Sequence, residues 1–173
     1  MKHIKALQTL TAVLMAMSTG LVKAQTVSVV SDNRTFAIES QQTQTEVKPG
    51  WKIIDLQLKD NYQKYLWGTK AKQLVDSRRP QFVVDTDTLL LNDMILIKLK
   101  TKKEYRRIPK AQVYANKYIR VDLSTFSIDI VGEDNFIIRP TQELEPGEYI
   151  FTWPTRATLG ELQDWIVWPF SVQ

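Results

Sequence analysis

Two pairs of closely spaced carboxylates are the side chains of this 173-residue chain that are best suited to acid–base chemistry. Asp85 and Asp87 form one pair, and Glu133 and Asp134 form the other. A glycosidase needs two carboxyl groups about 5–10 Å apart across a cleft, and a calcium site needs several oxygen ligands that converge from a loop. Both pairs fall in expected turns, where acidic side chains are common because they form local hydrogen bonds. We therefore expect neither pair to be catalytic or to bind a metal.

The first residues have the features of a secretory signal peptide. A short basic start is followed by a mostly apolar run, Leu7–Met17, and then by Val22 and Ala24 at the two positions that matter for cleavage. The alternative is a membrane anchor, but the apolar run is shorter than the about 20 residues that a helix needs to cross a bilayer. We therefore expect residues 1–24 to be a signal peptide and residues 25–173 to form one exported domain that is not a transmembrane protein.

Removal of this segment would change the chemistry that is available to the protein. The chain has no cysteine, and its one histidine is His3. Without either residue, disulfides, thiol nucleophiles, Ser–His–Asp triads and the usual zinc, haem or iron–sulfur ligands are excluded. We therefore expect a non-enzymatic protein that has no cofactor. Because small exported domains of eukaryotes often depend on disulfides, we expect this protein to lie in the periplasm or on the surface of a Gram-negative bacterium.

The net charge gives no sign of a nucleic-acid partner. The whole chain has 23 Lys and Arg and 19 Asp and Glu. Three of the lysines and no acid precede residue 25, so 20 basic and 19 acidic residues remain, a net charge of +1. A nucleic-acid-binding domain usually carries a clear basic excess, and we expect no such partner here.

The clearest structural pattern lies in Met94–Lys100, within Arg78–Ile108. Ile95, Ile97 and Leu99 alternate there with Leu96, Lys98 and Lys100, which predicts a strand with one buried face. Phe82–Val84 and Tyr105–Ile108 flank it as further candidate strands. We expect these three stretches to form the centre of one antiparallel sheet.

Alternation and turn residues predict the remaining elements. Gln41–Glu46 is expected to be a polar connection, and Asp60–Leu66 either a helical turn or a crossover. Pro49-Gly50 and Pro146-Gly147 predict tight turns, and Pro169 is expected at a sheet edge or a bend. Further strands are predicted at Thr26–Val30, Thr35–Ile38, Trp51–Lys59, Phe126–Ile130, Phe136–Arg139, Tyr149–Trp153 and Trp165–Val172. The total of about eight to ten short strands predicts an all-β, antiparallel two-sheet sandwich.

Several segments of the second half are similar to those of a known group of domains. They are Arg79–Val83, Leu96–Lys100, Tyr105–Ile108, Arg139-Pro140 and Leu144–Tyr149 with its Pro-Gly-Glu-Tyr run. In these segments the chain resembles exported bacterial modules of immunoglobulin-like sandwich fold. The resemblance implies this fold and export, and it implies no particular activity.

A basic run and the tryptophans are the candidate binding residues. The run comprises Lys98, Lys100, Lys102, Lys103, Arg106, Arg107 and Lys110. It could contact lipid A head groups, an acidic glycan or the acidic face of a partner protein, or it could be the solvated face of a strand and turn. We favour the solvated face. The tryptophans could form a sugar-stacking platform or lie in the core, and we expect most to be core and Trp67 to be exposed. The five tryptophans are Trp51, Trp67, Trp153, Trp165 and Trp168.

These patterns lead to one expected function and two alternatives. We expect a non-enzymatic binding or assembly module of the bacterial cell envelope, which uses sheet edges and loop tips to bind an envelope protein or a glycan. The alternatives are a carbohydrate-binding module that uses exposed tryptophans and, with less support, a hydrolase that depends on Asp or Glu. The residues predicted to form the binding surface are Lys98, Lys100, Lys102, Lys103, Arg106, Arg107 and Trp67.

Overall fold

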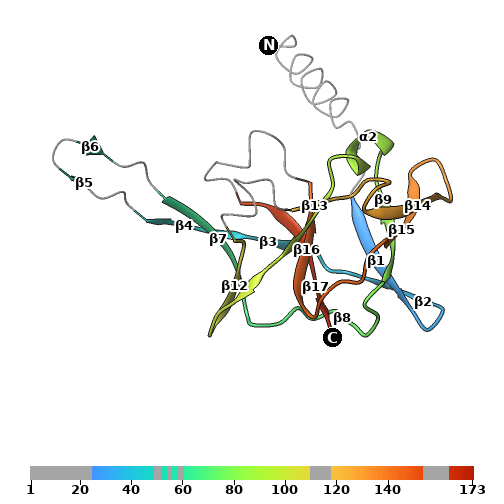
Figure 1. Ribbon diagram of the computed structural model, residues 1–173, viewed down its shortest axis with the longest axis horizontal. Coiled ribbons are helices and arrows are strands. Elements are labelled where there is room, and N and C mark those ends of the chain that lie inside the picture. The colour runs from blue at the N-terminus through green and yellow to red at the C-terminus, as the bar shows by residue number, and fades with distance from the viewer. Residues whose placement is uncertain (1–24, 49–51, 54–55, 58–60, 110–117, 154–163) are drawn as a thin grey trace, which may run out of the picture.

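The computed structural model describes residues 25–48, 52–53, 56–57, 61–109, 118–153 and 164–173 (Figure 1). The predicted signal peptide, the Pro49-Gly50 turn, Trp51 and Lys110 lie outside these ranges. Within them, the regular structure consists of strands and one four-residue helix, α2 (Thr88–Leu91), so the prediction of an all-β protein is confirmed. No helix in the described part of the chain is long and apolar enough to span a membrane.

Sheet A forms one side of the molecule. Its five antiparallel strands are, in spatial order, β14 (Phe126–Ile130), β15 (Asn135–Pro140), β9 (Gln81–Asp85), β1 (Thr26–Ser31) and β2 (Arg34–Ala37). The strands predicted at Thr26–Val30 and Thr35–Ile38 are confirmed. Asp32 and Asn33 connect them with φ angles of 50° and 60°, the positive values that two-residue hairpin turns need.

Sheet B packs against sheet A. Its strands are, in spatial order, β13 (Ile119–Arg120), β10 (Ile95–Lys98), β16 (Gly147–Thr152), β17 (Ile166–Val172) and β3 (Gln41–Gln42), with β8 (Leu74–Val75) paired in parallel to β17. Phe82 of sheet A contacts Phe151 and Phe170 of sheet B, with ring centroids 4.9 and 5.0 Å apart. These buried rings form the centre of a large apolar core between the two sheets. The two sheets together are consistent with the predicted sandwich.

Sheet C adds a third layer that the sequence did not predict. Its strands are, in spatial order, β11 (Lys100–Thr101), β12 (Tyr105–Arg107), β7 (Asn61–Trp67) and β4 (Gln44–Lys48). Leu66 and Ile108 belong to a second buried cluster with Ile97 and Ile150 of sheet B. Beyond β4 and β7, the short strands β5 (Lys52–Ile53) and β6 (Leu56–Gln57) pair as a hairpin that lies away from the body of the molecule (Figure 1).

The third layer explains why one prediction about β10 is wrong. The alternation predicts that Leu96 faces solvent together with Lys98. In the structure, Leu96 is 1% exposed and lies in the core between sheets A and B. Ile97, on the opposite face, is also completely buried. A strand that is covered on both faces needs apolar residues at successive positions, and β10 has them.

The predicted central sheet is also wrong, because its three stretches lie in three different sheets. β9 pairs with β1 and β15 in sheet A, β10 pairs with β13 and β16 in sheet B, and β12 pairs with β11 and β7 in sheet C. The helical turn α2 follows β9, and Leu99 alone separates β10 from β11. The chain therefore changes sheet twice within this segment.

Two segments that were not predicted to be strands contribute to strands. Gln41–Glu46 contributes to β3 and β4, which pair through backbone groups and so need no apolar side chains. Thr43 between them is buried, and its backbone N–H and side-chain oxygen bond to the backbone of Trp165. Asp60–Leu66 falls mostly in β7. The single strand predicted at Trp51–Lys59 is replaced by the β5–β6 hairpin in its described residues.

Pro169 lies in β17, which is not an outermost strand of sheet B. On the side away from β16, β17 pairs with β3 at Ile166 and Val167 and with β8 at Ser171 and Val172. Pro169 lies between these two partners, at a point where β17 is locally an edge. The missing proline N–H therefore removes no ladder bond there.

The turn that enters β16 depends on Gly147, because its φ of +151° is one that residues with a side chain rarely adopt. A Cβ at this position would also be 2.9 Å from Cε of Lys98. We expect Gly147→Ala to lower the free energy of unfolding by about 1–3 kcal/mol, as measured by urea denaturation. Gly132→Ala is the control, because its Cβ would meet Asn135 at an ordinary 3.5 Å. Equal losses in the two variants would contradict this account.

Candidate functional site

Three aromatic side chains cluster on the outer face of sheet C. Alternation along β7 and β12 turns Leu66 and Arg106 inward, where both are buried, so Tyr65, Trp67 and Tyr105 face outward. The ring centroids are 5.4 Å apart for Tyr65–Trp67, 5.5 Å for Tyr65–Tyr105 and 6.5 Å for Trp67–Tyr105. Trp67 is 57% exposed, which confirms the prediction that this tryptophan lies on the surface.

Gln44 of β4 holds two of these rings in place. Its side-chain oxygen accepts a hydrogen bond of 2.8 Å from Nε1 of Trp67 and one of 3.1 Å from the hydroxyl of Tyr65. An exposed tryptophan that is fixed in this way loses less conformational freedom when a ligand binds. The cluster is therefore a partly pre-organised surface.

Two cations lie next to the aromatic cluster. The strand register pairs Lys100 with Arg107, Arg107 with Tyr65, and Tyr65 with Gln44, so these four residues form one row across sheet C. Like charges directly opposite each other on neighbouring strands are destabilising. Within the described part of the chain, no carboxylate forms an ion pair with Lys100 or Arg107, and the buried Nε of Arg107 has no hydrogen-bond partner.

These residues define the candidate site, which we call the sheet C face: Gln44, Tyr65, Trp67, Lys100, Tyr105 and Arg107. The sequence predicted Trp67, Lys100 and Arg107 as binding residues, and the structure brings these three together. Tyr65, Tyr105 and Gln44 were not predicted. The spacing of Tyr65 and Trp67 is the signal that could have found them, since residues two apart share one face of a strand.

The rest of the predicted basic surface is divided among different environments. Lys102 and Lys103 are exposed in the turn between β11 and β12, where the backbone N–H of Lys102 donates to the carbonyl of Tyr105. Lys98 donates to Glu145 at 2.6 Å and lies 5.8 Å from the ring centroid of Tyr149. Its charge is therefore already paired.

The Lys98–Glu145 pair leads to a prediction about acid titration. The hydrogen bond and charge of Lys98 lower the pKa of Glu145 below its usual value of 4.5. A carboxyl group with a lowered pKa in the folded state contributes stability above its unfolded pKa, and this stability is lost as pH falls through the lowered value. In Lys98→Met we expect the pKa of Glu145 to return towards 4.5, as measured by NMR titration of its side-chain carboxyl carbon. Lys72→Met, which removes the partner of Glu39, is the control and should leave Glu145 unchanged.

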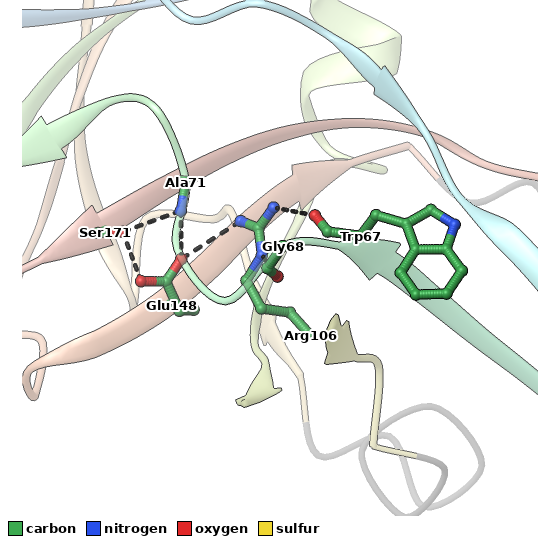
Figure 2. A network of polar contacts seen from close by, with 6 residues as sticks. All are labelled: Trp67, Gly68, Ala71, Arg106, Glu148 and Ser171. Atoms are coloured by element: carbon green, nitrogen blue, oxygen red, sulfur yellow. Dashed lines mark hydrogen bonds and ion pairs between the residues drawn. The ribbon is translucent and has the colours of Figure 1, made fainter. Parts of the chain in front are cut away.

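Arg106 corrects the sequence prediction, because it is 1% exposed and is not part of any surface. Figure 2 shows its guanidinium directed towards Glu148 of β16, at 3.3 Å. It also donates through Nε to the carbonyl of Gly68 at 3.1 Å and through Nη2 to that of Trp67 at 3.4 Å. Burial lowers the pKa of Arg106 and the charge of Glu148 raises it, and an arginine stays protonated in such a site.

Glu148 joins this network to the rest of sheet B. Its carboxylate accepts hydrogen bonds from the backbone N–H of Ala71 at 2.8 Å and from the hydroxyl of Ser171 at 2.5 Å (Figure 2). The network therefore connects four parts of the chain: β12, β16, β17 and the segment that follows β7. All of these contacts are internal, and the indole of Trp67 points away from them in Figure 2. The role of the Arg106–Glu148 network is to attach sheet C to sheet B.

The two carboxylate pairs lie apart from the sheet C face. Asp87 is the N-cap of α2 and accepts from the N–H of Leu89 at 2.7 Å, while Asp85 lies in β9. Glu133 and Asp134 lie in the turn between β14 and β15. Neither pair lines the described cavities, which have volumes of about 190 and 140 Å³. Among the described residues, no group of three or more His, Cys, Asp or Glu side chains could hold a metal ion.

Most of the tryptophans that the structure describes belong to the core or pack against it, as predicted. Trp165 and Trp168 are 4% and 5% exposed, and the half-buried Trp153 contacts Trp168 edge to face with centroids 4.8 Å apart. Trp67 is thus the exposed tryptophan of the described chain. Comparison of the sequence and structure with known protein families, curated proteins and solved structures gives no match.

Proposed function

We propose that this chain is an exported, non-enzymatic binding module of the bacterial cell envelope and that the sheet C face is its ligand-binding surface. The observation that carries the proposal is the exposed cluster of Tyr65, Trp67 and Tyr105, anchored by Gln44 on a face that the core does not use. Tryptophan, tyrosine and arginine are the residues that dominate binding energy at interfaces. Here all three types lie within one small surface.

Carbohydrate is the ligand class that fits this surface best. Aromatic rings offer apolar area to the C–H faces of sugars, while tyrosine and tryptophan keep a polar group for hydrogen bonding. The amide of Gln44 and the tyrosine hydroxyls can exchange hydrogen bonds with sugar hydroxyls. The three rings also lie on strands, and side chains on strands are positioned more precisely for binding than side chains on loops.

We further propose that sheets A and B form an immunoglobulin-like sandwich. In support, the hydroxyl of Tyr149, near the start of β16, donates to the backbone carbonyl of Glu145 at 2.7 Å. A tyrosine that bonds back to the backbone a few residues upstream is a feature of this class of sandwich. Export is supported by the basic start, the apolar run and the cleavage residues of segment 1–24.

Replacing Trp67 with alanine tests the binding face. We expect the purified protein to bind polysaccharides isolated from bacterial envelopes, with quenching or enhancement of its tryptophan fluorescence. Trp67→Ala should weaken this binding by about thirtyfold or more, since a central aromatic residue contributes about 2 kcal/mol. Calorimetric titration with each isolated polysaccharide provides the affinity.

Phe36→Ala is the matched control for this experiment. Phe36 is also an exposed aromatic residue, 43% accessible, but it lies on β2 of sheet A. We expect this variant to bind as the unmodified protein does. A Trp67→Ala protein that is folded and binds with full affinity would remove the sheet C face from consideration.

A further inference from the structure

We propose that the ligand of the sheet C face is an acidic polysaccharide, with its negatively charged groups bound by Lys100 and Arg107 and its sugar rings in contact with the aromatic cluster. This inference rests on the proposed function and adds the charge and orientation of the ligand. Three observations on the described residues support it: the opposed cations, the unsatisfied nitrogen of Arg107 and the order of side chains across the sheet.

The opposed cations are the first observation. Lys100 and Arg107 are directly paired across β11 and β12, and Lys102 and Lys103 follow in the adjoining turn. Glu104 is the one acidic residue between positions 100 and 107. Repulsion between opposed like charges costs stability in the free protein. An anionic group between Lys100 and Arg107 would replace this repulsion with two charge-assisted hydrogen bonds.

The second observation concerns the guanidinium of Arg107. Its Nε is buried and has no hydrogen-bond partner among the described residues, whereas almost all buried polar groups have one. A carboxylate, sulfate or phosphate can accept two parallel hydrogen bonds from a guanidinium. Turning this side chain towards such a group would expose Nε and supply the acceptor that it lacks. Arg106 has no comparable capacity, because it is buried and its three nitrogens already donate to Glu148 and two carbonyls.

The order of side chains across the sheet is the third observation, and it suits a linear chain of sugars that carries negative charge. Neighbouring strands are about 4.8 Å apart, so the row Lys100, Arg107, Tyr65 and Gln44 spans about 14 Å. A linear sugar chain along this row would meet cations, then an aromatic ring, then an amide. Glu46, the acid on β4, lies on the far strand, so the charged end of the face is the β11–β12 side.

Matched ligands and variants test the inference. The probes are polygalacturonate and the same polymer after its carboxyl groups are reduced to alcohols, which removes the charge and keeps the sugar backbone. We expect the purified protein to bind the acidic polymer at least about tenfold more tightly, and this preference to fall as salt screens the charges. The double variant Lys100→Gln/Arg107→Gln should lose the preference and keep its binding to the neutral polymer.

Two controls separate binding from folding and from net charge. Lys72→Gln removes an exposed lysine that pairs with Glu39, away from sheet C, and should keep the full preference. Lys100→Gln and Arg107→Gln should unfold at the same temperature as the unmodified protein or higher, because each removes a repulsion. A lower unfolding temperature in both would show that these side chains are structural and would overturn the inference.

The other outcomes distinguish this inference from the proposed function. If both polymers bind equally and Trp67→Ala weakens both, the acidic ligand is wrong and the binding face stands. If neither polymer's binding depends on Trp67, the proposed function itself fails. Tighter binding of a single-stranded oligonucleotide or of vesicles with anionic lipid than of polygalacturonate would also overturn the inference, because it would replace the polysaccharide with another polyanion.

Discussion

Replacing Arg106 with methionine is expected to lower the free energy of unfolding by about 3–5 kcal/mol, because it leaves the carboxylate of Glu148 buried without its cation. Arg106 and Glu148 are both almost completely inaccessible, so water cannot take the place of the missing partner. The carbonyls of Trp67 and Gly68 would lose their donors as well. Chemical denaturation followed by circular dichroism measures the loss.

A second substitution at Glu148 separates the charge from the hydrogen bonds. In Arg106→Met/Glu148→Gln the buried charge is gone, while the amide oxygen can still accept from the N–H of Ala71. We therefore expect the double variant to be more stable than Arg106→Met alone. Arg107→Met, at the neighbouring position on the outer face, should change stability by no more than about 0.5 kcal/mol. A double variant less stable than Arg106→Met would show that the carboxylate contributes through its hydrogen bonds alone.

Truncating either face of β10 should be costly. We expect Leu96→Ala and Ile97→Ala each to lower the free energy of unfolding by about 2–5 kcal/mol, because each removes a fully buried aliphatic side chain and leaves a cavity. Leu96 packs between sheets A and B, and Ile97 packs between sheets B and C. Denaturant titration of both variants measures whether the two losses are comparable.

The comparison of these two variants tests the third layer directly. In a two-layer sandwich, one face of β10 would be solvent-exposed and one of the two substitutions would be nearly neutral. Ile130→Ala provides the control, since Ile130 is 74% exposed on β14 and should change stability by no more than about 0.5 kcal/mol. An Ile97→Ala variant as stable as Ile130→Ala would mean that sheet C does not cover sheet B in solution.

The strands that could be predicted are those with strong local patterns. Phe126–Ile130 alternates, Gly132–Asn135 turns and Phe136–Arg139 returns, so both strands of this hairpin were predicted and they pair as β14 and β15. A local pattern does not indicate which other strand a predicted strand pairs with. β10 lies beside β16, far along the chain, and no property of Met94–Lys100 alone identifies that neighbour.

The candidate site was predictable in part for the same reason. Trp67 was expected to be exposed because it precedes Gly68 in a segment without a repeating pattern, and this was correct. Tyr65 was missed because Asp60–Leu66 was expected to be a helical turn or a crossover, which hid the alternation of β7. Arg106 was misplaced because a run of basic residues gives no sign that one of them has a buried carboxylate partner at Glu148.

The attachment of sheet C through Arg106 has a mechanical consequence. Tyr105 and Arg107 on β12 lie on the proposed binding face, and Arg106 between them forms an ion pair with Glu148 of β16 from the opposite side of the same strand. Tension applied through a ligand on this face would therefore pass along β12 directly into sheet B. To separate sheet C from sheet B, that tension would have to pull the buried guanidinium of Arg106 away from the buried carboxylate of Glu148.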